Sequence, residues 1–332
     1  MSAPVDALHR LANAPGESSY THTVPLYLTE ADVSSLLTPA DALDEVEGSF
    51  RRIAEGLVEN VPRHRLKLDH GMLAVMSAAD LGLGLAGVKV YAAGRGGASF
   101  VFCLFDASTH QAIAVIEADR LGQLRTGAAS AVAARFLARP GAASLGVIGA
   151  GRQAETQISC IRAALPSVER VVVYSRTPDA RKTFARSVNA EPAESSQEAA
   201  AQDVVVTITT SRDPVLRGDW LRPGALVCAA GSNRPEAREL DDAVLERAAF
   251  VCCDSVEDAR IESADLIEPV AHGVLDWLEV HELSEVVAGQ VQGRHSADDI
   301  VVFKSNGIAA WDVAIAAEAV ARARERKMGR QV

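Results

Sequence analysis

The chain has 332 residues, of which 48% are hydrophobic and 23% are charged, the ordinary composition of a folded globular protein. This length leaves room for two domains, and the composition argues against disorder and against a fibrous repeat. The formal net charge of −11 disfavours nucleic acids and anionic membranes as partners, so we expect any anion-binding site to be local.

The N-terminal segment, residues 1–22, contains Pro4, Pro15 and Gly16 and shows little hydrophobic periodicity, which predicts a loose leader before the first ordered element. It lacks the basic start and the apolar stretch of a signal peptide. The chain also contains no apolar run of about 18 residues that could span a membrane. We therefore expect a cytoplasmic protein.

A helix followed by a group of strands is predicted next. Thr38 and Pro39 form a helix-start signal, after which apolar residues recur at helical spacing at Leu43, Val46, Phe50, Ile53 and Leu57. Short strand-like runs separated by turn residues then occupy residues 65–68, 72–76, 85–91, 99–106 and 112–117. Strands so closely spaced predict a mixed or antiparallel sheet.

The pattern changes after an alanine-rich helix at residues 122–137, which ends at Pro140 and Gly141. Strand-like runs at residues 145–149, 171–174, 204–209, 225–229 and 250–253 now alternate with helical segments, including one that ends near residue 165 and one that starts at Pro178. This alternation is typical of βαβ units, so the fold class is α/β, with a Rossmann-like doubly wound parallel sheet beside a smaller mixed α+β domain.

A last alanine-rich helix at residues 308–324 is expected to pack back against the first domain, because the parallel sheet is complete before it. The predicted division therefore has two parts. Residues 23–125 and 308–332 form the smaller mixed domain, and residues 126–307 form the Rossmann-like domain.

A dinucleotide fingerprint of the form G-x-G-x-x-A directly follows the first strand of the alternating region and opens a helix. Gly149 permits the tight turn, Gly151 lets the backbone approach a pyrophosphate, and Ala154 allows close packing of helix and strand. Ala150, Arg152 and Gln153 complete the turn. A glycine turn without a ligand is the alternative interpretation.

The segment after the next strand indicates which nicotinamide cofactor is used. An acidic residue there would bind the ribose 2′-hydroxyl of NAD, but the segment contains Ser175, Arg176 and Thr177. An arginine fork and two hydroxyls suit a 2′-phosphate, which favours NADP(H), with NAD(H) as the second choice. The alternative is that Thr177 caps the next helix and Arg176 is a surface charge beside Arg181.

Several separated motifs resemble those of the ornithine cyclodeaminase/mu-crystallin family. The segment RTGAAS at residues 125–130 leads to the GAGRQA turn, and segments 87–89, 231–240 and 303–307 follow the family's order. The resemblance covers most of the chain. It implies that the smaller domain, residues 23–125 and 308–332, binds the substrate and forms a homodimer, and that the site lies between this domain and the dinucleotide-binding domain at residues 126–307. The predicted cofactor contacts, partly drawn from this resemblance, also include Arg125, Thr126, Thr207, Thr209, Ala230 and Ser305.

The resemblance also implies a substrate clamp. Family members hold the carboxylate of an amino or imino acid with two arginines and a lysine, whose equivalents look like Arg63, Arg125 and Lys89. Arg65 is the alternative to Arg63, because strand alternation points both to one face. Lys89 lies in an apolar run, where its charge must find a partner or its pKa must fall, unless the side chain extends to water at a strand edge.

One position departs from the cyclodeaminase pattern. Ornithine cyclodeaminases that resemble this chain carry an aspartate where Asn233 stands, and an amide cannot accept a proton in that role. The departure favours the ketimine reductase and imino-acid reductase members of the family. Asp312 on the last helix is a candidate for orienting Lys89 or a water, or else is simply a charge at a helix N-terminus.

The leading hypothesis is an NAD(P)H-dependent reductase that converts cyclic or acyclic 2-imino acids into L-amino acids, with Lys89, Arg63, Arg125, Asn233 and Asp312 acting on the substrate. A cyclodeaminase-type lyase with bound NAD, using another acid such as Asp312 or Glu236, is one alternative. A non-catalytic, NADPH-regulated binding protein is the other. The five cysteines form no CxxC pair and no histidine has zinc-ligand spacing, so we predict buried thiols and no metal.

Overall fold

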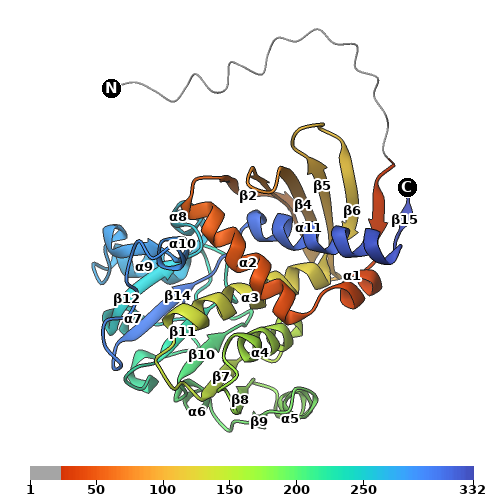
Figure 1. Ribbon diagram of the computed structural model, residues 1–332. Helices are drawn as coiled ribbons and strands as arrows, with labels where there is room; N and C mark the ends of the chain where they lie inside the picture. The colour runs from red at the N-terminus through yellow and green to blue at the C-terminus, as the bar shows by residue number, and fades with distance from the viewer. Residues whose placement is uncertain (1–23) are drawn as a thin grey trace, which may run out of the picture.

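The computed structural model describes residues 24–332, which form two β-sheets with helices between and around them (Figure 1). The predicted α/β class is confirmed, since one sheet is parallel and the other is mixed. The predicted leader at residues 1–22 lies outside the described residues.

The first sheet is a mixed sheet of seven strands, in which β1 runs parallel to β6 and the other neighbours are antiparallel. Its spatial order is β15 (Arg330–Gln331), β1 (Leu26–Leu28), β6 (Ala112–Glu117), β5 (Gly97–Asp106), β4 (Leu85–Gly94), β3 (Gly71–Asp80) and β2 (Val58–Leu68). Strand β2 begins seven residues before the predicted start at Arg65. The register shifts between Val61 and His64, where Pro62 removes a donor and hides the strand from the sequence pattern.

The second sheet has eight strands, and every neighbouring pair is parallel. Its order is β13 (Val280–Glu282), β12 (Ala248–Cys253), β14 (Ile300–Lys304), β11 (Leu226–Ala229), β10 (Val204–Thr207), β7 (Ser144–Ile148), β8 (Arg170–Tyr174) and β9 (Glu191–Pro192). The predicted strand at 204–209 ends at Thr207. Strand β14, which lies between β11 and β12, was not predicted as a strand.

Eleven α-helices connect these strands within the described residues. They are α1 (Glu30–Leu36), α2 (Pro39–Ala54), α3 (Asp119–Leu137), α4 (Arg152–Ala164), α5 (Pro178–Ser187), α6 (Ser196–Ala200), α7 (Asp242–Glu246), α8 (Val256–Glu262), α9 (Ala264–Ala271), α10 (Leu283–Val287) and α11 (Ala309–Arg326).

The start of α2 follows the predicted signal, because the hydroxyl of Thr38 accepts from the backbone N–H of Asp41 and Pro39 is the first helical residue. The end differs from the prediction. Leu57 lies outside the helix and is exposed, since Gly56, with φ of +72°, follows the C-cap residue. Helix α3 begins three residues before the predicted start at Gly122.

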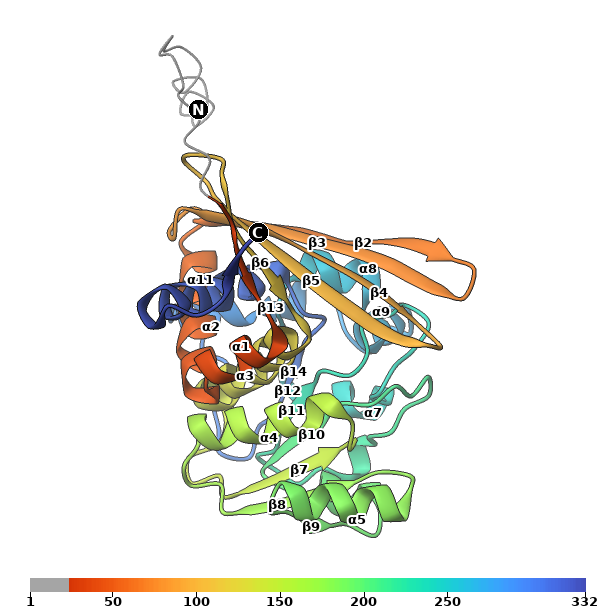
Figure 2. The ribbon, with the colours of Figure 1, turned by 90° about the vertical axis from the view of Figure 1, so that its right-hand side faces the viewer.

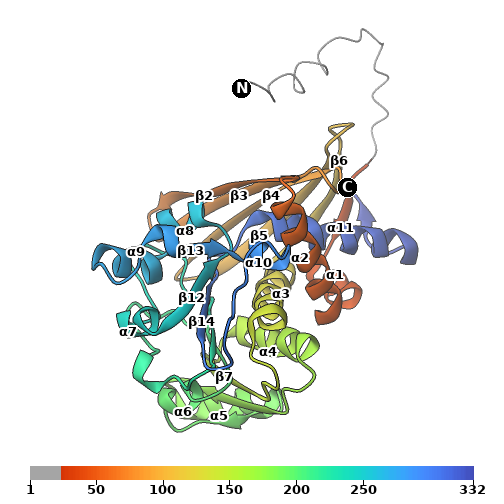
Figure 3. The same ribbon diagram turned by 60° about the vertical axis from the view of Figure 1, so that its left-hand side comes forward.

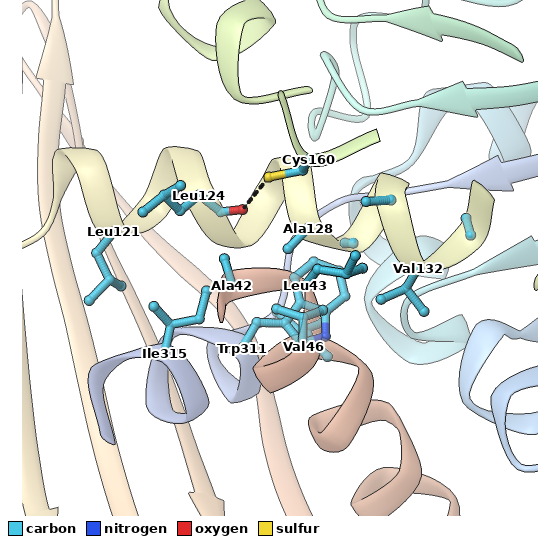
Figure 4. Packing of buried hydrophobic residues seen from close by; sticks show 14 of the residues in the cluster. Ala42, Leu43, Val46, Leu121, Leu124, Ala128, Val132, Cys160, Trp311 and Ile315 are labelled. Carbon is cyan, nitrogen blue, oxygen red and sulfur yellow. Dashed lines mark hydrogen bonds between the residues drawn. The ribbon is translucent and has the colours of Figure 1, made fainter. Parts of the chain in front are cut away.

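The core lies where α2, α3, α4 and α11 meet between the two sheets (Figures 2 and 3). Side chains from these helices point toward one another, including Leu43, Leu124, Cys160 and Trp311 (Figure 4). Helix α11 packs on β3 and β4 of the first sheet, as predicted for the last helix. One cluster of buried hydrophobic residues thus joins both sheets. The domain boundaries predicted at 125/126 and 307/308 stay a prediction.

Candidate active site

Two adjoining cavities mark the site at the carboxyl ends of the parallel strands. One has a volume of about 500 Å³ and the other of about 260 Å³, and both are lined by Gly151, Ile208, Thr209 and Thr210. The crevice outside the carboxyl ends of parallel strands is the usual place for ligands in this architecture. We refer to the cavity of about 500 Å³ as the first cavity and to that of about 260 Å³ as the second cavity.

The predicted fingerprint forms one wall of the first cavity. Gly149 has φ of +127°, and a Cβ atom there would lie 2.3 Å from the carbonyl oxygen of Ile208, so only glycine fits the turn. Gly151 is the N-cap of α4 and is exposed, which leaves the first backbone N–H groups of the helix open to an anion. Ala154 is buried against the core as predicted. The turn therefore fits the pyrophosphate of a dinucleotide.

The first cavity ends at Ser175, Arg176 and Thr177, the predicted recognition segment. Within residues 24–332, Arg176 is exposed and makes no hydrogen bond or ion pair, and the Thr177 side chain forms no capping bond. Arg181 faces elsewhere: it donates to the carbonyl of Ser175 and to Glu194, and it lies over the ring of Tyr174. Of Arg176 and Arg181, only Arg176 therefore has a guanidinium that is free to bind a ligand.

The second cavity collects the remaining predicted cofactor residues. Its lining includes Arg125, Thr126, Arg152, Gln153, Thr209, Ala230, Asn233 and Ser305. Thr207 is the exception among the predicted set, because it is fully buried and donates to the carboxylate of Glu239. The same carboxylate accepts from Thr209 and from the backbone N–H of Gly231, so it fixes the ends of β10 and β11.

Behind the second cavity, the structure brings Lys89, Asp312 and Arg125 together. The Nζ atom of Lys89 lies 2.9 Å from Asp312 Oδ1, and Arg125 Nε lies 3.7 Å from Asp312 Oδ2. Burial lowers the pKa of Lys89 to about 8, although the Asp312 carboxylate opposes the fall. A Cβ atom at Gly122 would lie 2.7 Å from Nζ, so this glycine makes room for the ammonium.

Arg63 and Arg65 both face one carboxylate that sequence reasoning missed. Glu262, at the end of α8, lies 2.8 Å from Arg63 Nη1 and 2.6 Å from Arg65 Nη1. The predicted common face of the two arginines is thus observed. Burial raises the pKa of Glu262, and the two guanidinium groups oppose this. No sequence pattern links residues 63 and 262.

The loop of residues 305–307 is held from both sides by side chains. Asp254 Oδ2 accepts from the Ser305 hydroxyl and from the backbone N–H groups of Asn306 and Gly307. Arg63 Nη2 donates to the carbonyl oxygens of Asn306 and Gly307 at 3.0 Å each. The loop therefore presents a fixed wall to the second cavity.

The structure also places Lys304, Glu236 and the cysteines. Lys304 is fully buried and lies 3.0 Å from Asp265 Oδ2. Glu236 is exposed. Four of the free cysteines are buried and Cys103 is partly buried.

Within residues 24–332, no group of three or more His, Cys, Asp or Glu side chains is arranged to hold a metal ion. No helix in this part of the chain is long and apolar enough to cross a membrane.

Comparison with known proteins gives matches over nearly the whole chain. The sequence model of the ornithine cyclodeaminase/mu-crystallin family matches residues 23–327. Alanine dehydrogenase of Archaeoglobus fulgidus is 33% identical over 322 residues, which are 92% of this chain and 98% of that protein.

Solved structures are similar to the same extent. Thermococcus litoralis Delta(1)-pyrroline-2-carboxylate reductase, in complex with NADH and L-proline, has a TM-score of 0.87 and 30% identity and covers 92% of this chain and 100% of its own. An archaeal alanine dehydrogenase dimer with bound NAD has a TM-score of 0.88 and 31% identity, with coverage of 93% and 99%. The likeness thus extends over both sheets.

Proposed function

This chain belongs to the ornithine cyclodeaminase/mu-crystallin family, and on that basis we propose that it is an NAD(P)H-dependent reductase of 2-imino acids that yields L-amino acids. The substrates are cyclic ketimine carboxylates or imines formed from 2-oxo acids with ammonia or amines. The observation that carries the proposal is the Lys89, Asp312 and Arg125 cluster directly beside a dinucleotide-binding turn.

Two arginines hold the α-carboxylate of the substrate in this proposal. The Nε–H groups of Arg63 and Arg125 are buried and have no hydrogen-bond acceptor in the described structure. An unpaired buried donor costs free energy, so a site that leaves two of them open favours a ligand that accepts both. A carboxylate is the group best suited to guanidinium donors.

When bound, NAD(P)H supplies the hydride for the imine carbon. Lys89 holds a proton at Nζ, and a pKa near 8 keeps that proton available at neutral pH while allowing its transfer to the imine nitrogen. Asp312 orients the ammonium. Asn233 borders the second cavity, where its amide can donate a hydrogen bond but cannot replace a carboxylate as base, which disfavours the cyclodeaminase reaction.

The proposal is tested by following 340 nm absorbance with NADPH or NADH and a panel of imines. The panel contains cyclic ketimine carboxylates, and pyruvate or oxaloacetate mixed with ammonia or methylamine. We expect substrate-dependent oxidation of the reduced cofactor. If no mixture consumes either cofactor, the reductase assignment is wrong, and ammonia release from ornithine becomes the next assay.

We further propose that NADP(H) is preferred over NAD(H), with Arg176 as the residue that binds the 2′-phosphate. Support comes from its free guanidinium at the end of the first cavity, between the Ser175 and Thr177 hydroxyls. Since a hydrogen bond to a charged group contributes about 1.5–3 kcal/mol, Arg176→Ala should lower the ratio of kcat/KM for NADPH over NADH by about ten- to a hundredfold.

Steady-state kinetics with both cofactors measure this ratio. Arg186→Ala removes an exposed arginine near the end of α5, the helix that follows Arg176, and should leave the ratio unchanged. A ratio that is the same in wild type and Arg176→Ala would reject the assignment of the 2′-phosphate to this residue.

The homodimer is proposed to form through the outer face of the first sheet, the face opposite α11. Cross-strand neighbours on this face include Val75 beside Val90, Val90 beside Val101, and Val88 beside Cys103. Within residues 24–332, helices lie only on the other face of these strands (Figure 2). An apolar sheet face of this kind favours burial against a second copy. The archaeal alanine dehydrogenase with the similar fold is a dimer. A cytoplasmic location stays a prediction.

Val90→Asp places a charge at the centre of this face and should convert the dimer into a monomer. Burying an unpaired carboxylate costs several kcal/mol, so we expect the dissociation constant to rise by about a hundredfold or more. Light scattering after size-exclusion chromatography measures the mass. Leu278→Asp, a matched change at a residue that is 88% exposed and lies outside the first sheet, should leave the mass unchanged. A dimeric Val90→Asp protein would place the interface elsewhere.

A further inference from the structure

We propose that Glu239 is a positioning residue for the nicotinamide half of the cofactor, because it sets the spacing of two strand ends that form a wall of the second cavity. Glu239 lies between β11 and α7 and is not among the residues that line either cavity. The inference rests on the proposed use of NAD(P)H. It adds a residue that acts on the cofactor through its neighbours and does not touch it.

The carboxylate of Glu239 is fully buried and joins two neighbouring strand ends. Its Oε1 atom accepts from the backbone N–H and the hydroxyl of Thr209, which follows β10, at 2.7 Å each. Its Oε2 atom accepts from the backbone N–H of Gly231, which follows β11, at 2.8 Å and from the Thr207 hydroxyl at 2.9 Å. Each carboxylate oxygen therefore holds the backbone of one strand end.

A carboxylate can accept from both backbone N–H groups at once, and an amide of the same length cannot. Glutamine has one acceptor oxygen, so its NH₂ group would face the N–H of Thr209 or of Gly231 as a second donor. The backbone also approaches closely here, because a Cβ atom at Gly231 would overlap Glu239 Oε1 and the Thr209 nitrogen. One ionised side chain thus determines how far apart the two strand ends lie.

Glu239 is itself held from behind. Asp265 Oδ1 accepts from the backbone N–H groups of Glu239 and Leu240 at 2.7 and 2.9 Å, and Asp265 Oδ2 lies 3.0 Å from Lys304 Nζ. The same Nζ donates to the carbonyl oxygen of Ser232, next to Gly231. A side chain supported in this way keeps its position when a ligand enters, so it can act as a fixed spacer.

The two strand ends face the part of the site where the nicotinamide half belongs. The adenine half fits the first cavity, which ends at Arg176, and the pyrophosphate fits the turn at Gly151, which lines both cavities. The remainder of a dinucleotide then extends into the second cavity, whose lining includes Thr209, Gly231 and Arg125. A shift of either strand end moves this wall relative to Arg125 and weakens binding of the nicotinamide half alone.

The experiment separates the two halves of the cofactor. Isothermal titration gives the Kd of NADP⁺ and NAD⁺, and of adenosine 2′,5′-bisphosphate and ADP, which lack the nicotinamide ring. The titrations are repeated with Glu239→Gln, Gly231→Ala and Asp203→Asn. Asp203 is the matched control, because it accepts from the backbone N–H groups of Ala143 and Ser144 and thus joins the amino ends of β7 and β10, opposite the cavities.

We expect Glu239→Gln to raise the Kd of both dinucleotides by about tenfold or more, the equivalent of at least one lost hydrogen bond. The Kd of the two fragments should change by less than about threefold, since the turn at Gly151 and Arg176 lie apart from the substitution. Gly231→Ala should give the same pattern, because its methyl group pushes the strand ends apart while the carboxylate remains. Asp203→Asn should leave all four Kd values unchanged.

An unchanged Kd of the dinucleotides in Glu239→Gln, or equal losses for dinucleotides and fragments, would overturn the inference. If Glu239→Gln does not fold, the same comparison in Gly231→Ala decides. The proposed function fails separately, in the 340 nm assay of the wild type. If the dinucleotides bind in a Glu239-dependent manner but no imine oxidises the reduced cofactor, the reductase assignment is wrong while the role of Glu239 stands.

Discussion

Replacing Lys89 by methionine is expected to lower kcat for imine reduction by about 10²- to 10⁴-fold, the usual contribution of a positioned proton donor. Methionine keeps the length and apolar packing of the stem and removes only the ammonium. Since Nζ is the group that carries the proton beside Asp312, KM should change much less than kcat. Stopped-flow and steady-state measurements of NAD(P)H oxidation give both constants.

The pH dependence of kcat for the wild-type enzyme provides a second test of Lys89 as the proton donor. The protonated form of Lys89 is the active one in the proposed reaction, and its pKa is about 8. As pH rises through this value the ammonium is lost, so kcat should be level below pH about 8 and fall about tenfold per unit above it. Asp312→Asn removes the carboxylate that raises this pKa, and the fall should then begin at lower pH.

A flat profile across pH 7–10, or a Lys89→Met enzyme with nearly normal kcat, would exclude Lys89 as the proton donor. Circular dichroism and melting curves of both variants serve as the control for folding. In Asp312→Asn, the amide oxygen can still accept from Lys89, so the geometry should be retained.

The second large effect is on stability and concerns Lys304. Lys304→Met is expected to lower the free energy of unfolding by about 3–5 kcal/mol, because it leaves a fully buried carboxylate without its cation. Asp265 lies 3.0 Å from Nζ, and both side chains have no exposed area. The same Nζ donates to the carbonyl of Ser232, which also loses its partner. Urea unfolding curves measure the change.

A double variant distinguishes the charge effect from packing. Asp265 Oδ1 accepts from the backbone N–H groups of Glu239 and Leu240, and an asparagine oxygen can do the same. Asp265→Asn combined with Lys304→Met should therefore recover most of the loss. If the double variant is no more stable than Lys304→Met, the buried charge is not the cause.

Local sequence patterns predict the architecture of this protein because each pattern depends on residues within a single helix, strand or turn. The turn at Gly149 and the cap at Thr38 are local motifs, and both appear as predicted. The alternation of short apolar strands with helices likewise predicts the parallel sheet. Strand β14 is the exception, because its short apolar run ends in Lys304 and overlaps a family motif, so the sequence analysis contains no strand there.

The partners of the site residues could not be predicted in the same way. Arg63 and Glu262 are separated by 199 positions in the chain, and Lys89 and Asp312 by 223. Hydrophobic periodicity indicates which face of its helix or strand a side chain occupies. It does not indicate which residue of another element packs against that face. The sequence predicts Asp312 as a candidate for orienting Lys89, whereas Glu262, Glu239 and Asp254 carry no motif that points to their partners.

The position of α11 has a consequence for the order in which the protein can assemble during synthesis. This helix follows every strand of both sheets except β15 in the chain, yet it covers the inner face of β3 and β4 and supplies the carboxylate that Lys89 binds. Until it emerges from the ribosome, the first sheet has an apolar inner face without this cover, while the strands and helices of the second sheet up to β14 are already available to pair. Nascent chains should therefore complete the parallel sheet first and gain the buried ion pair in a later step, which confines activity to molecules in which α11 has packed.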